Sequence, residues 1–282
     1  MKIRDFKTAP LPFQGQKRFF VPQYEKALKE INEKQKITLI VDLFGGSGLL
    51  SHVAKRTLPD CQVIYNDFDG YTRRLRNIPR TNLLLNDIRE LVTTEREKRI
   101  LPEIKDKVIN RIRAEEKTGF VDYITISTSL LFSANYVLNI NELTKATLYN
   151  NIKQTEYLDC ANEYLNGLDV LKQDYYLLFE RYKNYPGVLF TIDPPYLSTD
   201  TTTYNSDKYW RLGDYLNVLR LLKDTNYVFF TSNKSSLIEL CEWFTNNYNL
   251  HNPFHKAKTV RRKNTLTPNG SYTDIMIYKN KE

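Results

Sequence analysis

The sequence contains little cysteine, histidine and glycine, with three Cys, three His and ten Gly among 282 residues. The three Cys cannot all pair and form no CxxC, which argues against a disulfide framework and favours a reducing compartment. With so few Cys and His, we expect no structural zinc site. The glycine fingerprint GxGxxG is also missing, which argues against an NAD-linked oxidoreductase.

Long apolar runs are missing as well. The N-terminus, MKIRDFKTAP, has no apolar h-region, and no stretch approaches the roughly 18 apolar residues of a membrane-spanning helix. We therefore expect neither secretion nor a membrane span, and we expect a cytoplasmic protein.

The chain does have a basic charge balance and a large apolar fraction. It carries 41 Lys and Arg against 33 Asp and Glu, a formal net charge of +8, and 41% of its residues are hydrophobic. The apolar fraction is enough for a sizeable core, and the positive charge is compatible with a polyanionic partner.

Apolar runs alternate with amphipathic stretches, as in an α/β protein. A strand at 37–43, a glycine turn, a helix reaching residue 56 and a strand within 61–70 form a βαβ unit. Further strands are expected at 168–171, 187–193, 226–233 and 271–280. Between them lies a charged stretch of helical period followed by a Tyr- and Asn-rich stretch. We predict one doubly wound α/β domain, residues 1–88 and 168–282, with a mostly helical insertion at 89–167.

Acidic residues follow several of the expected strands, at the edge where open α/β sheets bind ligands. Asp42 and Asp67 end the first two strands, and Asp193-Pro194-Pro195-Tyr196 follows the strand at 187–193. Each proline lacks an N–H and fixes its own φ, so the backbone holding this acid and this ring is rigid. A third acid is either Asp87 or Asp174, and we favour Asp174 because it follows a strand at a normal βαβ interval.

The turn after the first strand is rich in small residues: Phe44, Gly45, Gly46, Ser47 and Gly48. Glycine there lets a ligand approach the backbone, although a tight turn without a ligand would use the same residues. Asp67 could accept both hydroxyls of a ribose. Alternatively, Asp67 or Asp69 could cap a helix that starts near Tyr71.

Four motifs in one order resemble the Dam-like (alpha-group) adenine-specific DNA methyltransferases. They are LPFQGQKRFF with Lys17 at the family's lysine, VDLFGGSG, the tetrapeptide DPPY, and TVRRKNTLTPNGSYTDIMIYKN near the C-terminus. The resemblance covers about 200 residues and skips the insertion. QGQK lacks the usual glycine pair, and the stretch typical of GATC-recognising members is not visible, so the target sequence does not carry over.

The resemblance implies a Rossmann-like sheet with helices on both faces, S-adenosyl-L-methionine as cofactor, and transfer of its methyl group to the N6 amine of an adenine in a specific short DNA sequence. The inserted domain would recognise the target. Asp193 and the Pro194 carbonyl would accept the two N6 hydrogens, and Tyr196 would stack on the flipped base. Lys17 and Asp42 would lie near the methionine end of the cofactor, Phe44 beside it, Asp67 at its ribose and Asp174 at its adenine. Lys17 and Asp42 could instead form a structural ion pair.

DNA contacts are expected in two places. Lys258, Arg261, Arg262 and Lys263 belong to a basic run that would bind phosphates, although such runs are often solvated loops. In the insertion, where acids and bases nearly balance, Asn135, Tyr136, Asn139 and Lys145 would read bases. A loop at 201–210 would close over the flipped base.

Two other functions fit the same motifs. An RNA adenine methyltransferase would use the same tetrapeptide, and a catalytically silent DNA-binding relative would keep the fold. The intact DPPY speaks against the silent relative. We expect double-stranded DNA as partner, a nucleoid-associated location when bound to it, no metal, and a monomer or weak dimer.

Overall fold

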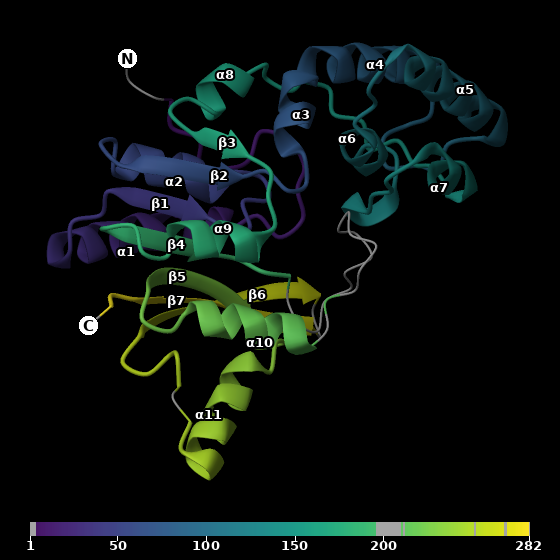
Figure 1. Ribbon diagram of the computed structural model, residues 1–282. Coiled ribbons are helices and arrows are strands. Elements are labelled where there is room, and N and C mark those ends of the chain that lie inside the picture. Colours follow the sequence, from purple (N-terminus) through teal and green to yellow (C-terminus); the bar gives the residue numbers. More distant parts are fainter. Residues whose placement is uncertain (1–3, 196–209, 211, 251, 268–269, 282) are drawn as a thin grey trace. The chain divides into compact units, whose positions relative to one another are not determined.

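The computed structural model describes residues 4–195, 210, 212–250, 252–267 and 270–281 (Figure 1). The chain forms two compact units. Unit 1 comprises residues 1–8, 16–69 and 165–282, and unit 2 comprises residues 9–15 and 70–164. Within the described ranges, no helix is long and apolar enough to cross a membrane.

A seven-stranded sheet forms the centre of unit 1, in the order β3-β2-β1-β4-β5-β7-β6. Its strands are β1 (Leu39–Asp42), β2 (Gln62–Asn66), β3 (Asp169–Leu171), β4 (Val188–Ile192), β5 (Asn226–Ser232), β6 (Lys258–Thr267) and β7 (Gly270–Lys279). The first five are parallel, whereas β7 is antiparallel to β5 and β6. The predicted mixed α/β architecture is confirmed. The strand β6 had no counterpart among the expected strands.

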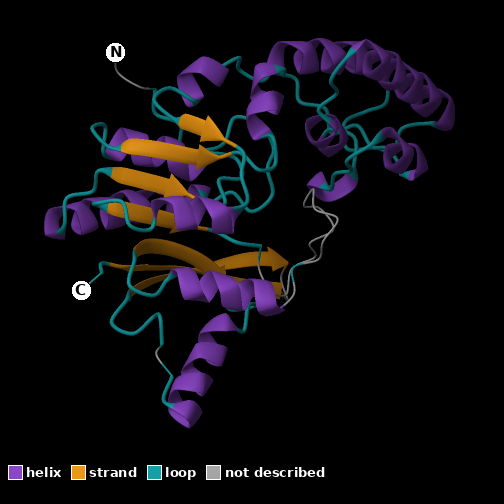
Figure 2. Cartoon of the chain, in the orientation of Figure 1, coloured by secondary structure: helices purple, strands orange, loops and turns teal. Residues whose placement is uncertain are grey.

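Helices cover both faces of this sheet, as Figure 2 shows. They are α1 (Val21–Lys34), α2 (Leu49–Thr57), α9 (Tyr175–Tyr182), α10 (Leu212–Leu221) and α11 (Leu237–Tyr248), with a short 3-10 turn η1 (Arg18–Phe20) before α1. Side chains alternate along a strand, so β1 sends Ile40 to the core shared with α1 and α2, and Val41 to the core shared with α9, α10 and α11. Both cores are continuous and largely aliphatic and aromatic.

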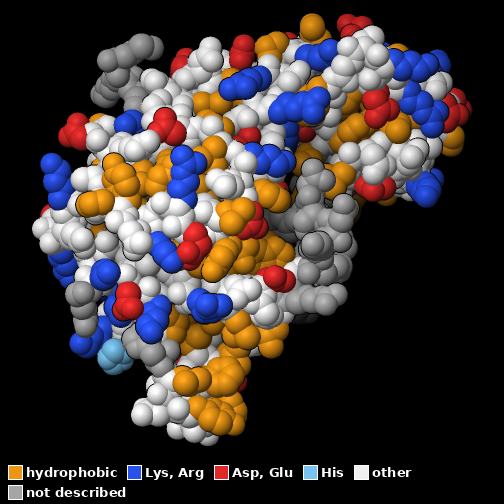
Figure 3. All heavy atoms as spheres, viewed as in Figure 1, with side chains coloured by type: hydrophobic (Ala, Val, Ile, Leu, Met, Phe, Trp, Pro, Cys, Tyr) orange, Lys and Arg blue, Asp and Glu red, His pale blue; other side chains and the backbone are white. Residues whose placement is uncertain are grey.

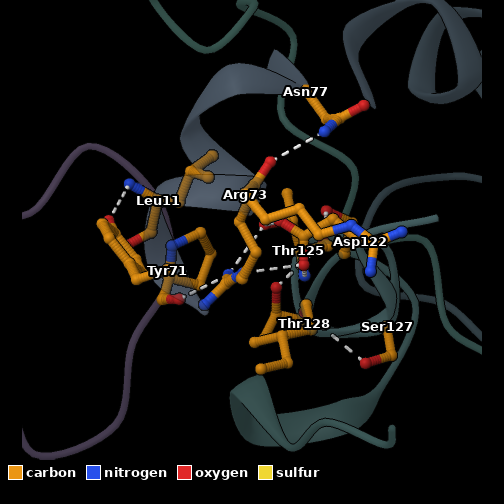
Figure 4. Close-up of polar contacts among 12 residues, drawn as sticks. Leu11, Tyr71, Arg73, Asn77, Asp122, Thr125, Ser127 and Thr128 are labelled. Atoms are coloured by element: carbon orange, nitrogen blue, oxygen red, sulfur yellow. Dashed lines mark hydrogen bonds and ion pairs between the residues drawn. The ribbon is translucent and has the colours of Figure 1, made fainter. Parts of the chain in front are cut away.

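Unit 2 is mostly helical in the described part of the chain. It contains α3 (Tyr71–Arg76), α4 (Ile78–Leu91), α5 (Pro102–Thr118), α6 (Tyr123–Thr128), η2 (Phe132–Ala134), α7 (Ile140–Lys145) and α8 (Ala161–Tyr164). A buried ion pair joins α3 to α6, in which Arg74 Nε lies 2.9 Å from Asp122 Oδ1. Asp122 also caps α6 by accepting from the Thr125 amide, and Figure 4 shows these two residues side by side.

The segment 9–15 is tied to α3 by its backbone. The Leu11 amide donates to the Tyr71 hydroxyl over 2.9 Å, and Arg74 donates to the Pro12 carbonyl over 2.8 Å. Unit 2 therefore includes a piece of chain that precedes the first strand, which the pattern of the sequence does not indicate.

Two local expectations about helix caps change in the structure. The N-cap residue of the helix at Tyr71 is Gly70, at φ +74°, so neither Asp67 nor Asp69 occupies the N-cap position. Asp87 lies inside α4 and does not cap the start of the insertion. Arg89, where the insertion was expected to begin, lies inside α4, and the two compact units divide at Gly70. The functional division of the chain at residues 88–89 and 167–168 stays a prediction.

Candidate active site

The carboxyl ends of β1, β2 and β4 bring the predicted acids to one edge of the sheet. In the register of β1 with β4, Asp42 lies opposite Thr191, two residues before Asp193. Asp67 directly follows β2, whose Tyr65 lies opposite Asp42 on the other side of β1. The parallel ladder therefore places Asp42 between the strands that carry Asp67 and Asp193.

Lys17 reaches this edge and forms an ion pair with Asp193. The Lys17 ammonium lies 2.6 Å from Asp193 Oδ2, and the two side chains are only 8% and 18% exposed. The ion pair suggested between Lys17 and Asp42 is not the one found. Asp42 instead accepts a hydrogen bond from Ser51 Oγ over 2.7 Å.

Burial controls the charge of both acids. Burial raises the pKa of Asp193, and the neighbouring Lys17 opposes that rise. Burial also raises the pKa of Asp42 to about 7. The charge of Asp193 adds to this rise, and a hydrogen bond from Ser51 opposes it. Asp42 Oδ1 is buried and has no hydrogen-bond partner among the residues that the structure describes. The site is thus a water-poor place with two acids and one lysine, where an additional hydrogen-bond donor or cation would be stabilised.

The glycine turn between β1 and α2 is shaped by Tyr65. A Cβ on Gly45 would overlap the Tyr65 ring and lie 2.8 Å from the Asn66 carbonyl oxygen. Gly48 has φ +71° and precedes the first residue of α2. Close packing and a left-handed backbone therefore require these glycines even without a ligand. Phe44 is partly exposed, and Ser47 is buried.

Asp67 is connected to the glycine turn. The Tyr65 hydroxyl lies 2.8 Å from the Gly46 carbonyl oxygen and 3.1 Å from Asp67 Oδ1. Asn66 donates to the carbonyls of Leu43 and Gln173, which joins the ends of β1 and β3. Tyr65 and Asn66 were missed from the sequence, because both read as ordinary members of a buried strand.

The two candidates for the third acid lie in different units. Asp174 is exposed, follows β3 and caps α9 by accepting from the Tyr176 and Leu177 amides. Asp87 lies in unit 2 and pairs with Arg111 over 2.7 Å. Asp174 is therefore at the sheet edge with Asp67, although one of its oxygens is engaged in capping.

Two of the four basic residues suggested for phosphate contacts have partners within the chain, and two are exposed. Lys258 pairs with Glu30 over 2.6 Å, and Arg262 donates to the Phe19 carbonyl over 3.0 Å. Arg261 and Lys263 are exposed on β6. On the face seen in Figure 3, Lys and Arg side chains are interspersed with Asp and Glu and do not gather in one patch.

In unit 2, the suggested base-reading residues lie around η2 and α7. Asn139 caps α7 by accepting from the Glu142 amide over 3.0 Å. Asn135 and Lys145 are exposed, and Tyr136 is partly buried.

Tyr196 and residues 201–209 of the expected loop lie outside the described residues, while Pro194 and Pro195 follow β4 as expected. Within the described ranges, no group of three or more His, Cys, Asp or Glu could hold a metal ion.

Comparison with known proteins places the chain in a family. The family model for D12 class N6 adenine-specific DNA methyltransferases matches residues 13–259. A Haemophilus influenzae protein named "Putative methyltransferase" is 37% identical over 285 residues, which cover 98% of this chain and 93% of that protein. Members of the family use S-adenosyl-L-methionine. The chain thus belongs to the D12 class of N6 adenine-specific DNA methyltransferases, the Dam-like family.

Proposed function

We propose that this protein transfers a methyl group from S-adenosyl-L-methionine to the N6 amine of a flipped-out adenine in a specific short DNA sequence. The observation that carries the proposal is Asp193, which stands at the carboxyl end of β4, followed by two prolines and paired with Lys17 over 2.6 Å. The family membership supports the same reaction.

The exocyclic amine of adenine is a poor nucleophile because its lone pair is conjugated with the ring. Asp193 and the Pro194 carbonyl accept the two N6 hydrogens, which favours the tetrahedral nitrogen needed for attack. Pro194 and Pro195 hold these acceptors rigidly, and Tyr196 stacks on the base. Lys17 occupies one oxygen of Asp193 and opposes the rise that burial causes in the pKa of this carboxyl, so that the other oxygen is left to accept from N6.

The residues at the sheet edge fit the proposed cofactor. Bound there, S-adenosyl-L-methionine supplies an activated methyl group on a positively charged sulfur. Asp42, with a buried oxygen that has no partner in the described part of the chain, suits a cationic or donating group. Asp67 accepts from the ribose and Asp174 from the adenine. Lys17, Phe44 and the glycine turn at 45–48 complete the binding residues.

We further propose that two parts of the chain have different functions. Residues 1–88 and 168–282 bind the cofactor and carry out the transfer, and the insertion at 89–167 recognises double-stranded DNA. Base contacts come from Asn135, Tyr136, Asn139 and Lys145. Phosphate contacts come from Lys258, Arg261, Arg262 and Lys263. Because Lys258 and Arg262 have partners within the chain, DNA must compete for these two side chains.

The decisive experiment is methylation-sensitive long-read sequencing of DNA from cells that express the protein or its Asp193→Ala variant. We expect methylated adenines within one short motif for the wild type and none for the variant, because the variant lacks an acceptor for the amine. Both proteins should still bind S-adenosyl-L-methionine. Full methylation by Asp193→Ala would refute the role of this acid, and unmodified DNA from a well-folded wild type would favour an RNA substrate or a silent relative.

A further inference from the structure

Helix α11 carries large apolar side chains that the core of unit 1 does not cover. Every residue of this helix is described, and of its 12 residues only Leu237 and Cys241 are buried. Four further apolar residues form what we call the α11 stripe: Leu240, Trp243, Phe244 and Tyr248. Trp243 is 49% exposed and Tyr248 is 63% exposed, and the other two are partly buried.

The members of the α11 stripe lie together on one side of the helix. Their spacing of three, four and eight residues is that of a single helical face. The ring centroids of Trp243 lie 5.3 Å from Phe244 and 5.4 Å from Tyr248. Figure 3 shows hydrophobic side chains gathered along this helix. Single apolar residues on a surface need no explanation, but exposed rings in mutual contact form a patch, and such patches mark interaction sites.

The charges around the α11 stripe exclude two kinds of partner. The sequence has no Lys or Arg between Lys234 and Lys256, although the chain carries 41 of them among 282 residues. The charged residues of α11 are Glu239 and Glu242, and both are exposed. Nucleic acids and anionic membranes are bound through Lys and Arg, so this helix is unsuited to either. The α11 stripe therefore fits the surface of a protein.

The same charges favour a second copy of this chain as that protein. Two copies that each carry a net charge of +8 repel one another over most of their surface. This repulsion is smallest where basic side chains are missing, which is the case along α11. Two copies can thus bring their α11 stripes together without bringing Lys or Arg side chains into contact.

The polar residues beside the α11 stripe indicate an antiparallel arrangement. Glu239 and Asn246 are both exposed and lie seven residues apart, so they flank the stripe on the same side. In an antiparallel pair related by a two-fold axis, this side of one helix meets the same side of the other in reverse order. Glu239 of each copy then lies opposite Asn246 of the second copy, where an amide can donate to a carboxylate. The antiparallel order also opposes the two helix dipoles.

The size of the α11 stripe fits a weak interface. With about half of each ring exposed, and 150–250 Å² covered when an aromatic side chain is buried, the stripe presents roughly 300 Å² of apolar surface. Two stripes with their polar rims would bury on the order of 1,000 Å² in total, which is the size of a weak and reversible contact.

We propose that the α11 stripe is a self-association surface, on which two copies of this chain pair antiparallel about a two-fold axis as a weak homodimer. This inference goes beyond the proposed methyl transfer and does not rest on it.

Sedimentation velocity of the full chain without DNA, from micromolar to near-millimolar concentration, tests the surface. We expect a reversible dimer for the wild type. Trp243→Glu should raise its dissociation constant at least about tenfold, because the change places a charge in the centre of the contact. Leu177→Glu is the matched control, since Leu177 is 56% exposed on α9, and it should dimerise like the wild type. Both substituted residues are exposed, so the melting temperatures should change little.

A pair of charge variants tests the antiparallel arrangement. Asn246→Lys should lower the dissociation constant roughly two- to tenfold, because each dimer gains two exposed ion pairs with Glu239, although the variant increases the net charge. Adding Glu239→Lys to this variant places Lys opposite Lys, so the double variant should dimerise more weakly than the wild type.

Each contrary result overturns a stated part of the proposal. A wild type that stays monomeric at every concentration excludes self-association and leaves a different protein as the occupant of the α11 stripe. A dimer that is equally tight in Trp243→Glu uses another surface. Equal dissociation constants of Asn246→Lys and the double variant contradict the antiparallel pairing. None of these results bears on the proposed reaction, which the sequencing of methylated DNA tests separately.

Discussion

At the scale of single residues, the contact between Lys17 and Asp193 determines how the site is charged. Burial raises the pKa of Asp193, and the lysine opposes that rise from 2.6 Å away. An ionised carboxylate accepts hydrogen bonds from an amine more strongly than a protonated carboxyl does. The lysine therefore acts through Asp193, as a positioning residue, and its removal should appear in the pH dependence of the reaction.

We predict that Lys17→Met raises the pKa of Asp193 further, because burial then acts without an opposing charge. Asp193 would lose its charge at a higher pH, so the acid limb of kcat/KM for methyl transfer should move to higher pH, and Lys17→Arg should largely restore it. Lys26→Met is the control, since Lys26 is 75% exposed on α1. Superimposable pH profiles of wild type and Lys17→Met would show that the pair does not set the charge of Asp193.

At the scale of elements, the turn between β1 and α2 depends on the tyrosine beneath it. Tyr65 is fully buried, and its hydroxyl reaches both the turn and Asp67. The turn, the ribose-binding candidate and the end of β2 are thus one packed assembly. A substitution at Gly45 should therefore disturb the turn, Asp67 and the end of β2 together.

Gly45→Ala should destabilise the protein by about 1–3 kcal/mol, because the new methyl group overlaps the Tyr65 ring in a filled core. Gly213→Ala is the matched control. Gly213 lies in α10, and a methyl group added there would meet no atom within 4 Å, so alanine should stabilise the helix by up to about 1 kcal/mol. Urea denaturation measures both variants. Equal stability of wild type and Gly45→Ala would mean that the turn can shift away from Tyr65 at no cost.

At the scale of the whole molecule, local patterns predicted the parallel part of the sheet. The apolar runs at 37–43 and 187–193 match β1 and β4, because a strand buried on both faces is visible as a continuous apolar run. The basic strand β6 was missed because its Lys and Arg residues hide the β pattern. The division of the compact units at Gly70 has no counterpart in the sequence pattern, because compactness depends on contacts between distant segments.

From the sequence, only those residues of the candidate site that follow a strand could be predicted. Asp42, Asp67 and Asp193 follow apolar runs, so their shared edge follows from the parallel topology. The partner of Lys17 could not be predicted, since Lys17 and Asp193 are 176 positions apart in sequence.

The two compact units should also differ in what stabilises them. Unit 2 contains the buried pair of Arg74 and Asp122, whose side chains are 7% and 1% exposed. Removing one member leaves the other charge buried without its partner, which typically costs about 3–5 kcal/mol. The pair of Arg111 with Asp87 lies in the same unit, but its side chains are 29% and 47% exposed, so its loss should cost at most about 1 kcal/mol.

We therefore expect Arg74→Met to speed amide hydrogen exchange in residues 9–15 and 70–164, while β1, β4 and β5 keep their protection. Arg111→Met should change exchange much less, because Arg111 is 29% exposed and Glu115, its second partner, keeps an ion pair with Arg80. This variant controls for the loss of an arginine from unit 2. Mass spectrometry of exchange in peptides from both units measures this directly. Equal acceleration across the sheet strands would mean that the two units unfold as one cooperative structure, and would contradict a separate stabilising role for the Arg74–Asp122 pair.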